Sequence, residues 1–526
     1  MKKDFLWWRD GIIYQIYPRS FADSNNDGIG DLPGITSQLN YLEALGVDAI
    51  WLSPIYPSPD VDYGYDVADY CAIDPKFGTM KDFEKLVKEA NQREIHIILD
   101  LVLNHTSDQH EWFIESKKSR HNPYHDWYIW KDPKPNGDPP NNWKAIFGGS
   151  GWEYDPHLDQ YYYHMFYKEQ PDVNWRNPKV REAMLDVFRF WLKKGVDGFR
   201  LDVFNAYFKD PNFKDNQSKF GIRPFDRQEH IYDVSQPEMY PLIEEIRDIL
   251  DQHKKTYVVG ETFLADTEQT ATYCGEGKLH AAFNFEFPSN RWHPKRFLES
   301  ALKWYRALPN NAWPNNFLSN HDMTRAASRY CFGEDDRRAK VALAMLLTLK
   351  GTPFVYYGEE IGLRDIPIRK KSDVKDPIGK LFWPFFKGRD GCRAPMQWSS
   401  EINAGFSQTD PWLPVNEDYP RRNVVRQKSD PESLLNFFKR LVAVRKAQPA
   451  LQRGDFTPLD NNPRDILAFE RTLDEDRIVV LLNFKSSERY FELPSGDWLD
   501  LFDGETLRSG KTTLRPYHVM ILKKTA

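Results

Sequence analysis

Carboxylates, histidines and one arginine stand at the ends of four short apolar runs. These runs end in the segments DLVLNH (100–105), GFRLD (198–202), VVGETF (258–263) and LSNHD (318–322). Side chains two positions apart in a strand lie on one face, so Arg200 would sit beside Asp202 and favour its ionised form. Taken alone, such a pair is an ordinary structural ion pair, and a lone acid at a strand end is usually a helix cap. Three carboxylates, two histidines and an arginine at four strand ends favour instead a nucleophilic carboxylate in a catalytic centre.

The elements that must position these residues are short strands that alternate with helical patterns. The apolar runs lie at 12–17, 47–53, 95–105, 196–202, 256–261, 281–287, 315–322 and 353–360. Eight strands separated by helices predict an α/β fold, a (β/α)8 TIM barrel. The active site of such a barrel lies at the carboxyl ends of the strands, where the four motifs end.

Two further segments depart from the barrel pattern. About 70 residues after the third run, 106–176, are rich in Trp, Tyr, Pro, Asn and Gly, which predicts an inserted subdomain. After a predicted last barrel helix at 433–451, short strand patterns predict a C-terminal antiparallel β-sandwich. The expected organisation is therefore a barrel at 1–105 and 177–449, an insertion at 106–176, and a β domain at 450–526.

The composition and net charge of the chain limit the kinds of partner and the cellular compartment that we expect. The chain has 526 residues and a net charge of −6, and it carries no basic stripe with interleaved aromatics, which argues against a nucleic-acid partner. We find neither a secretory signal nor a run of 18 apolar residues, so we expect no membrane association. The four cysteines lie far apart, which favours reduced thiols in the cytoplasm. An aromatic content of 15% is a mild indication of carbohydrate binding.

The stretch DSNNDGIGD (23–31) resembles the first half of a calcium loop. Asp23, Asn25 and Asp27 alternate and Gly28 follows, as in an EF-hand, but the twelfth position is Gly34 where that motif needs Glu. No helical patterns flank the stretch on both sides. The residues alone leave two interpretations open, a metal loop and an Asx-rich surface turn.

Together, the four motifs and their order resemble the α-amylase family of glycoside hydrolases (family 13), and more narrowly its exo-acting α-glucosidases and oligo-1,6-glucosidases. The resemblance covers nearly the whole chain. It implies that Asp202 is the nucleophile, Glu261 the general acid/base and Asp322 the transition-state stabiliser. In a retaining mechanism the pKa of Glu261 should be raised, and about 5–5.5 Å should separate the carboxyl groups of Asp202 and Glu261.

The same resemblance implies which residues bind the substrate. His105 and His321 would hydrogen-bond the sugar whose bond is cut. Asp62 and Tyr65, from DYGYD, would line the non-reducing-end pocket, with Asp62 clamping a sugar together with Arg393 of GCRAPMQW; Ala394 of that segment is often Thr in relatives. A pocket closed in this way would release one glucose at a time. The remaining expected substrate contacts are Arg200, Val203 and two aromatics that could equally be core, Phe147 and Phe166.

The linkage specificity is indicated by two features that disagree. Relatives that favour α-1,6 bonds tend to carry Val at the position of Val203, although Val is also a common strand residue. In contrast, IGKLFWPFFKGRDGC (378–392) resembles α-glucosidases in which α-1,4 activity and glucosyl transfer are frequent. We expect α-1,6 substrates such as isomaltose, with an α-1,4-preferring or transglucosylating α-glucosidase as the alternative.

Other members of the family share the triad and perform different functions. Trehalose synthases and sucrose isomerases move the glucosyl unit internally, but the arginine-rich motif of sucrose isomerases is not evident here. The heavy chains of certain amino-acid transporters are non-enzymatic; they lose catalytic carboxylates and carry a membrane anchor, in contrast to this sequence.

For the loop at 23–31, the resemblance implies one structural Ca²⁺, with Mg²⁺ as a possible substitute, and no organic cofactor. The partner would be a small oligosaccharide, and the protein a monomer or weak homo-oligomer. The implied metal ligands are the side chains of Asp23, Asn25, Asp27 and Asp31 and the carbonyl of Ile29.

Overall fold

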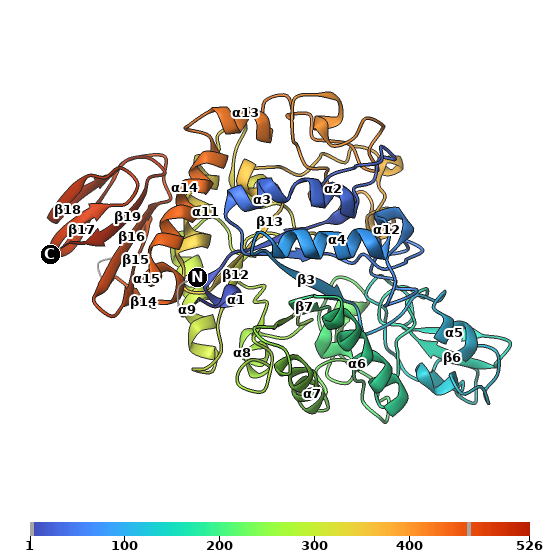
Figure 1. Cartoon of the computed structure of the whole chain (residues 1–526). Helices are drawn as coiled ribbons and strands as arrows, with labels where there is room; N and C mark the ends of the chain where they lie inside the picture. Colours follow the sequence, from blue (N-terminus) through green and yellow to red (C-terminus); the bar gives the residue numbers. More distant parts are fainter. Residues whose placement is uncertain (1–4, 460–463, 526) are drawn as a thin grey trace.

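Eight short parallel strands surround the centre of the molecule in the computed structural model, which describes residues 5–459 and 464–525 (Figure 1). Their hydrogen-bonded order is β11-β10-β7-β3-β2-β1-β13-β12. Each strand lies in one of the eight predicted runs, or overlaps it, so the predicted (β/α)8 fold is confirmed. The strands are β1 (Ile13–Ile16), β2 (Ala49–Leu52), β3 (His96–Leu101), β7 (Gly198–Leu201), β10 (Tyr257–Gly260), β11 (Ala281–Ala282), β12 (Asn315–Phe317) and β13 (Thr352–Tyr356).

The seam between β11 and β12 is closed by aromatic packing. Among the described residues no hydrogen-bonded ladder joins these two strands, which stand at the two ends of the sheet order. Instead, the Phe317 ring lies 5.3 Å from that of Phe283 and 5.2 Å from that of Phe285. Phe283 also packs on Trp51 and Phe354 inside the barrel. Inward side chains therefore fill the barrel centre as a core.

Amphipathic helices cover the outside of the barrel (Figure 1). Helix α4 (Met80–Asn91) shows why: Thr79 and Asp82 form a capping box at its start, and its apolar positions recur at helical spacing and are buried. The other long helices are α6 (Pro178–Lys193), α7 (Met239–Asp251), α9 (Pro294–Ala307), α11 (Arg337–Thr348) and α14 (Leu434–Ala447). Shorter helices are α1 (Trp7–Asp10), α2 (Leu32–Ser37), α3 (Leu39–Leu45), α8 (Thr267–Thr272), α10 (Ala326–Tyr330), α12 (Pro377–Phe382), α13 (Val424–Ser429) and α15 (Pro449–Arg453). None of the helices in the described part of the chain combines the length and apolar character that a bilayer crossing requires.

The segment between β3 and α6 extends beyond the barrel. It carries α5 (Glu111–Ser116) and a three-stranded antiparallel sheet in the order β4-β6-β5, formed by β4 (Trp130–Lys131), β5 (Trp152–Asp155) and β6 (Gln160–Tyr163). Its aromatic core joins Trp143, Trp152 and Tyr163 to Phe225, which lies in the long connection from β7 to α7, and to Ile378 of α12. Three excursions from the barrel are thus packed against one another over the strand ends. The connection from β7 also holds the short hairpin β8 (Gln217–Ser218) and β9 (Gln228–Glu229).

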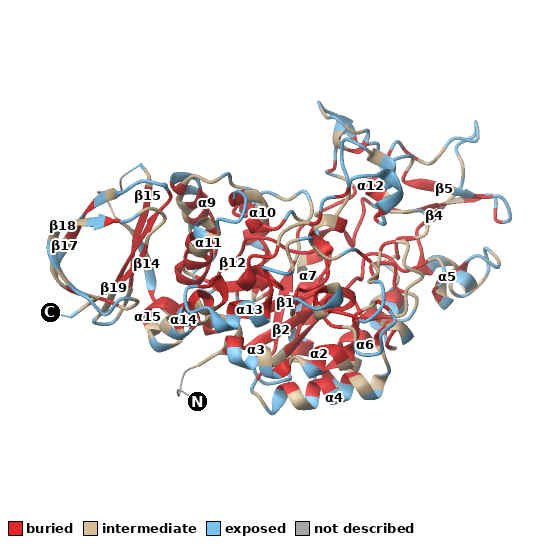
Figure 2. Ribbon diagram, turned by 90° about the horizontal axis from the view of Figure 1, so that it is seen from above, coloured by how far each residue is buried: buried red, intermediate tan, exposed pale blue. Residues whose placement is uncertain are grey.

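Six antiparallel strands follow the last barrel helices, which confirms the predicted C-terminal antiparallel β domain. Their order in a single sheet is β14-β15-β16-β19-β17-β18. Alternate residues of β15 face different cores: Leu467 and Phe469 join the core shared with the barrel, whereas Ile466 and Ala468 pack in a separate core with Trp498. Figure 2 shows this buried inner face and the exposed outer side of β17 and β18. The strands are β14 (Asp455–Pro458), β15 (Ile466–Leu473), β16 (Asp476–Asn483), β17 (Arg489–Asp500), β18 (Thr506–Leu514) and β19 (Val519–Lys524).

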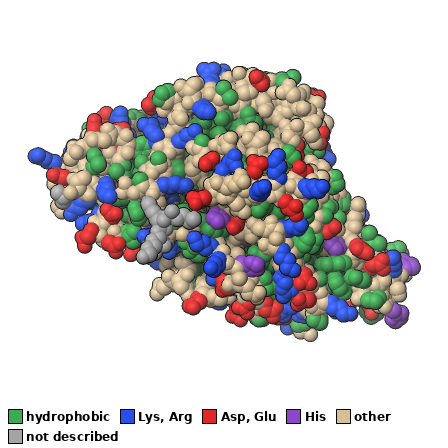
Figure 3. All heavy atoms as spheres, viewed as in Figure 1, with side chains coloured by type: hydrophobic (Ala, Val, Ile, Leu, Met, Phe, Trp, Pro, Cys, Tyr) green, Lys and Arg blue, Asp and Glu red, His purple; other side chains and the backbone are tan. Residues whose placement is uncertain are grey.

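The surface carries both signs of charge. On the face shown in Figure 3, Lys and Arg side chains are interspersed with Asp and Glu. This mixture agrees with the small net charge of −6.

Candidate active site

Arg200 joins three carboxylates at the ends of three neighbouring strands. It lies on β7 and is 1% exposed. Its Nη1 is 2.7 Å from Oδ1 of Asp100 on β3 and 2.7 Å from Oδ1 of Asp202, while Nη2 donates to Oε2 of Glu261. The guanidinium lies 5.4 Å from the ring centre of Trp51. Because β3, β7 and β10 are adjacent, this one buried cation gathers the carboxyl groups at the ends of all three strands.

The surroundings give these carboxyl groups different protonation. Burial raises the pKa of Glu261 to about 8, assisted by the charges of Asp202 and Asp322 and opposed by Arg200. Burial likewise raises the pKa of Asp100 to about 7. For Asp322 burial works in the same direction, but contacts with His321 and two arginines outweigh it and hold the pKa well below its usual range. The site therefore holds a proton on Glu261 and a negative charge on Asp322 at neutral pH, which is the division of roles that acid–base catalysis needs.

His321 is fixed by polar contacts on both ring nitrogens. Gln15 Nε2 lies 2.8 Å from His321 Nδ1, and as the amide is a donor, Nδ1 must accept and Nε2 carries the proton. Nε2 is 2.6 Å from the Tyr65 hydroxyl and 3.1 Å from Oδ2 of Asp322. The Tyr65 hydroxyl in turn donates to Asp100 at 3.0 Å, and its ring stacks on His321 at 5.2 Å. The predicted residues Tyr65, His321 and Asp322 are thus brought together with the Arg200 cluster.

His105 borders the same cluster through the loop that carries Tyr65. Its Nε2 lies 2.9 Å from the Tyr65 carbonyl and 3.0 Å from Nε2 of Gln170. The ring of Phe166 lies 5.0 Å from His105, and that of Phe147 lies 5.7 Å from Phe166. Both aromatics therefore adjoin the site, although Phe147 is only 9% exposed and is also part of the inserted core.

Asp62 takes part in a direct ion pair, while its expected role in clamping a sugar together with Arg393 stays a prediction. Asp62 pairs with Arg389, whose Nη2 is 2.6 Å from Asp62 Oδ1, and not directly with Arg393. Arg393 is fully buried, with Nε donating to the His321 carbonyl at 2.8 Å and Nη2 to Asp322 at 2.9 Å, whereas its Nη1 has no partner among the described residues. Arg389 also reaches Asp322 at 3.2 Å, which makes it the link between Asp62 and Asp322.

Buried residues that the sequence reasoning did not single out orient this link. Asp376, which is fully buried, accepts from Nε of Arg389 at 2.9 Å and from its Nη2 at 3.0 Å. Arg389 lies in the FKGRDGC segment and Asp100 opens the DLVLNH motif. Both segments were therefore indicated by the sequence, but only for other residues in them. Gln15, Gln170 and Asp376 stand in no motif that would have indicated them.

Val203 is not an ordinary strand residue, because β7 ends at Leu201 and Val203 has a left-handed conformation with φ +33° and ψ 42°. A β-branched residue in this region is strained, by about 1–3 kcal/mol. Phe204, the next residue of this turn, packs closely on Gly260 of β10. A Cβ added to Gly260 would lie 2.4 Å from Cε1 of Phe204, so only glycine leaves room for this contact. The strained turn places Asp202 at the tip between β7 and β10. Val203 itself is buried, 6% exposed.

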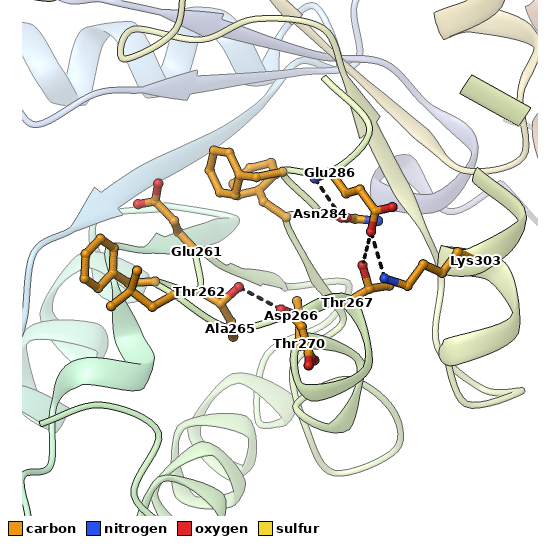
Figure 4. Close-up of a pocket in the computed structure, with 13 residues that line it drawn as sticks. Glu261, Thr262, Ala265, Asp266, Thr267, Thr270, Asn284, Glu286 and Lys303 are labelled. Atoms are coloured by element: carbon orange, nitrogen blue, oxygen red, sulfur yellow. Dashed lines mark hydrogen bonds and ion pairs between the residues drawn. The ribbon is translucent and has the colours of Figure 1, made fainter. Parts of the chain in front are cut away.

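A cavity of about 350 Å³ opens beyond Glu261, between the connections that follow β10 and β11 (Figure 4). Phe263, Asn284, Phe285 and Glu286 are among the residues that line it. Oε2 of Glu286 accepts from the Thr267 hydroxyl at 2.8 Å, which ties the two connections together. The cavity lies on the Glu261 side of the cluster.

The acidic loop after β1 is organised by its own side chains. Asp23 accepts the backbone N–H of Asn26 and of Gly28, each at 2.8 Å, and Asp27 accepts that of Ile29 at 2.8 Å. Asp31 caps helix α2 by accepting the N–H of Gly34, and its other oxygen accepts from Ser24. Within residues 5–459 and 464–525, no three His, Cys, Asp or Glu side chains gather as a metal site.

The atoms of this loop that are expected to bind a metal ion are nevertheless all oxygen atoms. The two ends of the loop lie close together, because the N–H of Asp31 donates to the Ala22 carbonyl at 3.0 Å and Oδ2 of Asp31 accepts the N–H of Ser24 at 3.0 Å. Two approaching carboxylates, together with an amide and a carbonyl oxygen, have the chemistry that Ca²⁺ prefers.

Comparison with known proteins gives matches over nearly the whole chain. Residues 15–454 match the model of the α-amylase catalytic domain, and residues 456–521 match that of the maltogenic amylase C-terminal domain. A probable alpha-glucosidase of Rhizobium meliloti (strain 1021) is 43% identical over 512 residues, covering 94% of this chain and 92% of that relative. An oligo-1,6-glucosidase of Bacillus cereus is 39% identical over 565 residues, covering 98% of this chain and 99% of that relative.

Solved structures show the same similarity. The alpha-glucosyl transfer enzyme XgtA is 38% identical and superimposes with a TM-score of 0.94 over 99% of this chain and 100% of that one. The trehalulose synthase MutB from Pseudomonas mesoacidophila MX-45 is 35% identical, with a TM-score of 0.90 over 99% of each chain.

Proposed function

The chain belongs to the α-amylase family of glycoside hydrolases, and from that premise we propose that it is an exo-acting α-glucosidase that releases glucose from the non-reducing end of short α-glucosides. The observation that carries this proposal is the sharing of Arg200 by Asp202 and Glu261. Contact of both carboxyl groups with one guanidinium keeps them near each other, which supports a retaining mechanism, in which no water has to fit between them and the sugar in the first step.

In the first step of this mechanism, Asp202 attacks the anomeric carbon while Glu261 gives its proton to the leaving glycosidic oxygen. The raised pKa of Glu261 keeps that proton available at neutral pH. In the second step Glu261, now ionised, removes a proton from water, and the hydroxide replaces Asp202 at the same carbon. Asp322 favours the positive charge that develops on the sugar ring in both steps.

A pocket closed at one end accounts for the proposed release of single glucose units. Arg389 ties Asp62 to Asp322, while Arg393 holds Asp322 from the other side. Charged groups so placed would bind the hydroxyls of a terminal glucose, with His105 and His321 beside it. A longer chain could not continue through this end.

We favour α-1,6 substrates such as isomaltose. Support comes from Val203, held in a strained turn next to the nucleophile, and from the similarity to the oligo-1,6-glucosidase of B. cereus. The α-glucosidase of R. meliloti and the glucosyl transfer enzyme XgtA support the alternative, an α-1,4-preferring or transglucosylating enzyme. The likeness to trehalulose synthase keeps internal glucosyl transfer as a third candidate.

One set of assays tests the proposal. We would measure kcat/KM for isomaltose and for maltose, and follow the anomer of the released glucose by NMR. Initial release of α-glucose with a ratio well above one supports a retaining α-1,6-glucosidase. Release of β-glucose would contradict the mechanism, whereas a ratio well below one would make the enzyme α-1,4-preferring. In both assays Asp202→Asn should abolish turnover while the protein still folds.

We also propose that the loop at 23–31 holds one structural Ca²⁺, with Mg²⁺ as a possible substitute. Asp23, Asn25, Asp27 and the Ile29 carbonyl would supply oxygen, and Asp31 would do so while it caps α2. Bound there, the ion would neutralise the carboxylates and stabilise the loop; it takes no part in the reaction.

We further propose that the protein works in the cytoplasm on small oligosaccharides, as a monomer or weak homo-oligomer. Its four cysteines are free, and three of them are buried, as reduced thiols would be.

A further inference from the structure

Asn284 lies in the wall of the cavity beyond Glu261 and has an unused hydrogen-bond donor. The residue is 7% exposed. Its Oδ1 accepts the N–H of Glu286 at 3.0 Å, which fixes the orientation of the amide and identifies the other atom as Nδ2. In the described part of the chain Nδ2 has no partner. A buried donor without a partner is costly, so its retention calls for a ligand that accepts from it.

Next to this donor lies a possible acceptor, the carboxylate of Glu286, of which one oxygen makes both of the contacts described here. Glu286 is paired with Lys303 at 3.0 Å and accepts from Thr267 at 2.8 Å, and both contacts go to Oε2. Oε1 is used by neither. Figure 4 shows Asn284, Glu286 and Lys303 on one side of the cavity and Glu261 on the other.

The rest of the lining combines apolar side chains with the polar side chains of Thr262, Asp266, Thr267 and Thr270. The apolar side chains include Phe263, Leu264 and Phe285, and Leu264 is 53% exposed. Apolar groups, including two aromatic rings, together with a donor and an acceptor suit a pyranose ring, which has C–H faces and hydroxyls at its edge. An inorganic ion or an aliphatic chain would not use both kinds of group.

We propose that Asn284 and Glu286 recognise hydroxyl groups of the leaving portion of the substrate, and that they favour leaving groups built from sugar rings. The cavity begins at Glu261, the residue that protonates the leaving oxygen, so its occupant is the portion released and not the glucose retained on Asp202. Asn284 Nδ2 donates to one hydroxyl, and Oε1 of Glu286 accepts from another. This inference rests on the proposed function, because it assigns the leaving side from the role of Glu261.

The same contacts would position an acceptor sugar in glucosyl transfer. There a hydroxyl oxygen of the acceptor attacks the anomeric carbon, the bond to Asp202 breaks, and the hydroxyl proton passes to Glu261. Recognition of the acceptor ring by Asn284 and Glu286 therefore affects cleavage and transfer alike.

The test compares substrates whose leaving groups differ in hydroxyl content. We would measure kcat/KM for isomaltotriose, which releases a disaccharide, and for 4-nitrophenyl α-glucoside, whose leaving group has no sugar hydroxyls. For Asn284→Ala and the near-isosteric Asn284→Asp, the ratio of the two values should fall about 3- to 10-fold, the effect of one lost hydrogen bond. Glu286→Gln should lower the same ratio. Melting temperatures of all variants show whether each has folded.

A matched control is Glu268→Gln, because Glu268 also pairs with Lys303, at 3.6 Å, but does not line the cavity. If the Lys303 ion pair alone mattered, Glu268→Gln and Glu286→Gln would have equal effects, and the inference would be wrong. An equal loss on both substrates in the Asn284 variants would show a structural role and would also overturn it. If the wild-type protein cleaves neither substrate, the proposed function falls and this inference falls with it.

Discussion

Arg389 and Asp62 form an ion pair of 2.6 Å although 327 residues separate them in the sequence. Both side chains are largely buried, 12% and 6% exposed. The same guanidinium contacts Asp322 and Asp376, so it links three carboxylates that belong to different connections of the barrel. The proposed closed end of the substrate pocket would depend on this one cation.

Replacement of Arg389 should therefore damage binding at the closed end. In Arg389→Ala three carboxylates lose a partner, and we expect kcat/KM for isomaltose to fall about 30-fold or more, which corresponds to about 2 kcal/mol or more. Arg389→Lys should recover only part of this loss, because an ammonium cannot make the forked contacts. Steady-state kinetics on the purified variants is the measurement.

Arg369→Ala provides the control, since Arg369 lies on the same excursion and pairs with Glu417 at 3.0 Å, but is 66% exposed. Exposed pairs contribute about 0–1 kcal/mol, so its kinetics should match the wild type. Equal effects of the Arg369 and Arg389 variants would show that the excursion as a whole, and not the Arg389 contacts, is responsible.

Glu261→Gln should slow the cleavage of different substrates to different degrees, depending on how much each leaving group needs a proton. A sugar alkoxide is a poor leaving group, so hydrolysis of isomaltose should fall by about 10²–10⁴-fold. Formation of the glucosyl-enzyme from 4-nitrophenyl α-glucoside should fall far less, because nitrophenolate leaves without protonation. The burst of nitrophenol in rapid-mixing experiments measures that step. A loss of the burst as large as the loss on isomaltose would be inconsistent with Glu261 as the acid.

The pH profile should reflect the opposite protonation of Glu261 and Asp322. The active form has Glu261 protonated, and its pKa is raised to about 8, so kcat/KM should fall as pH rises through about 8. Asp322 has a pKa well below its usual range and stays ionised across neutral pH, so it adds no loss there. The alkaline limb should disappear in Glu261→Gln when activity is measured on the aryl glucoside. A limb that persists in this variant would have to come from another group.

Removal of Ca²⁺ should lower the melting temperature without changing the chemistry of the site. At a free Ca²⁺ concentration of about 100 Kd, a single bound ion stabilises the folded chain by about 2.7 kcal/mol. Melting curves in EGTA and in Ca²⁺ should therefore differ for the wild type and coincide for Asp27→Ala. Identical wild-type curves would show instead that 23–31 is an Asx-rich turn, as its internal hydrogen bonds allow.

The positions of the strands and of the four motifs were predictable because they depend on local patterns. An apolar run that ends in Arg200 and Asp202 must be a strand whose last residues reach the barrel rim, whatever the remainder of the chain does. The barrel then brings Glu261 and Asp322 to the same rim. The local patterns thus indicated a catalytic centre at the rim, and the resemblance to the α-amylase family implied the roles of the three carboxylates.

Side-chain partners in long connections could not be predicted in the same way. Arg389 and Arg393 are four positions apart in one segment, and the way the excursion folds over the barrel decides that Arg389 is the one that pairs with Asp62. The left-handed conformation of Val203 is invisible in a sequence where Val simply follows a strand. Asn284 is indicated as a binding residue only by the unpaired donor of its side-chain amide, and that feature exists only in the folded structure.

The barrel seam between β11 and β12 has a consequence for motion. A hydrogen-bonded ladder holds two strands in one register. The rings of Phe283, Phe285 and Phe317, in contrast, can shift relative to one another while they stay in contact. We expect this seam to fluctuate more than the other strand pairs. Phe285 also lines the cavity proposed for the leaving portion, so movement of the rings at the seam would widen or narrow that cavity while Arg200 keeps its contacts with Asp202 and Glu261. The enzyme would thus combine a stiff half that breaks the bond with a compliant half that admits leaving groups of different size.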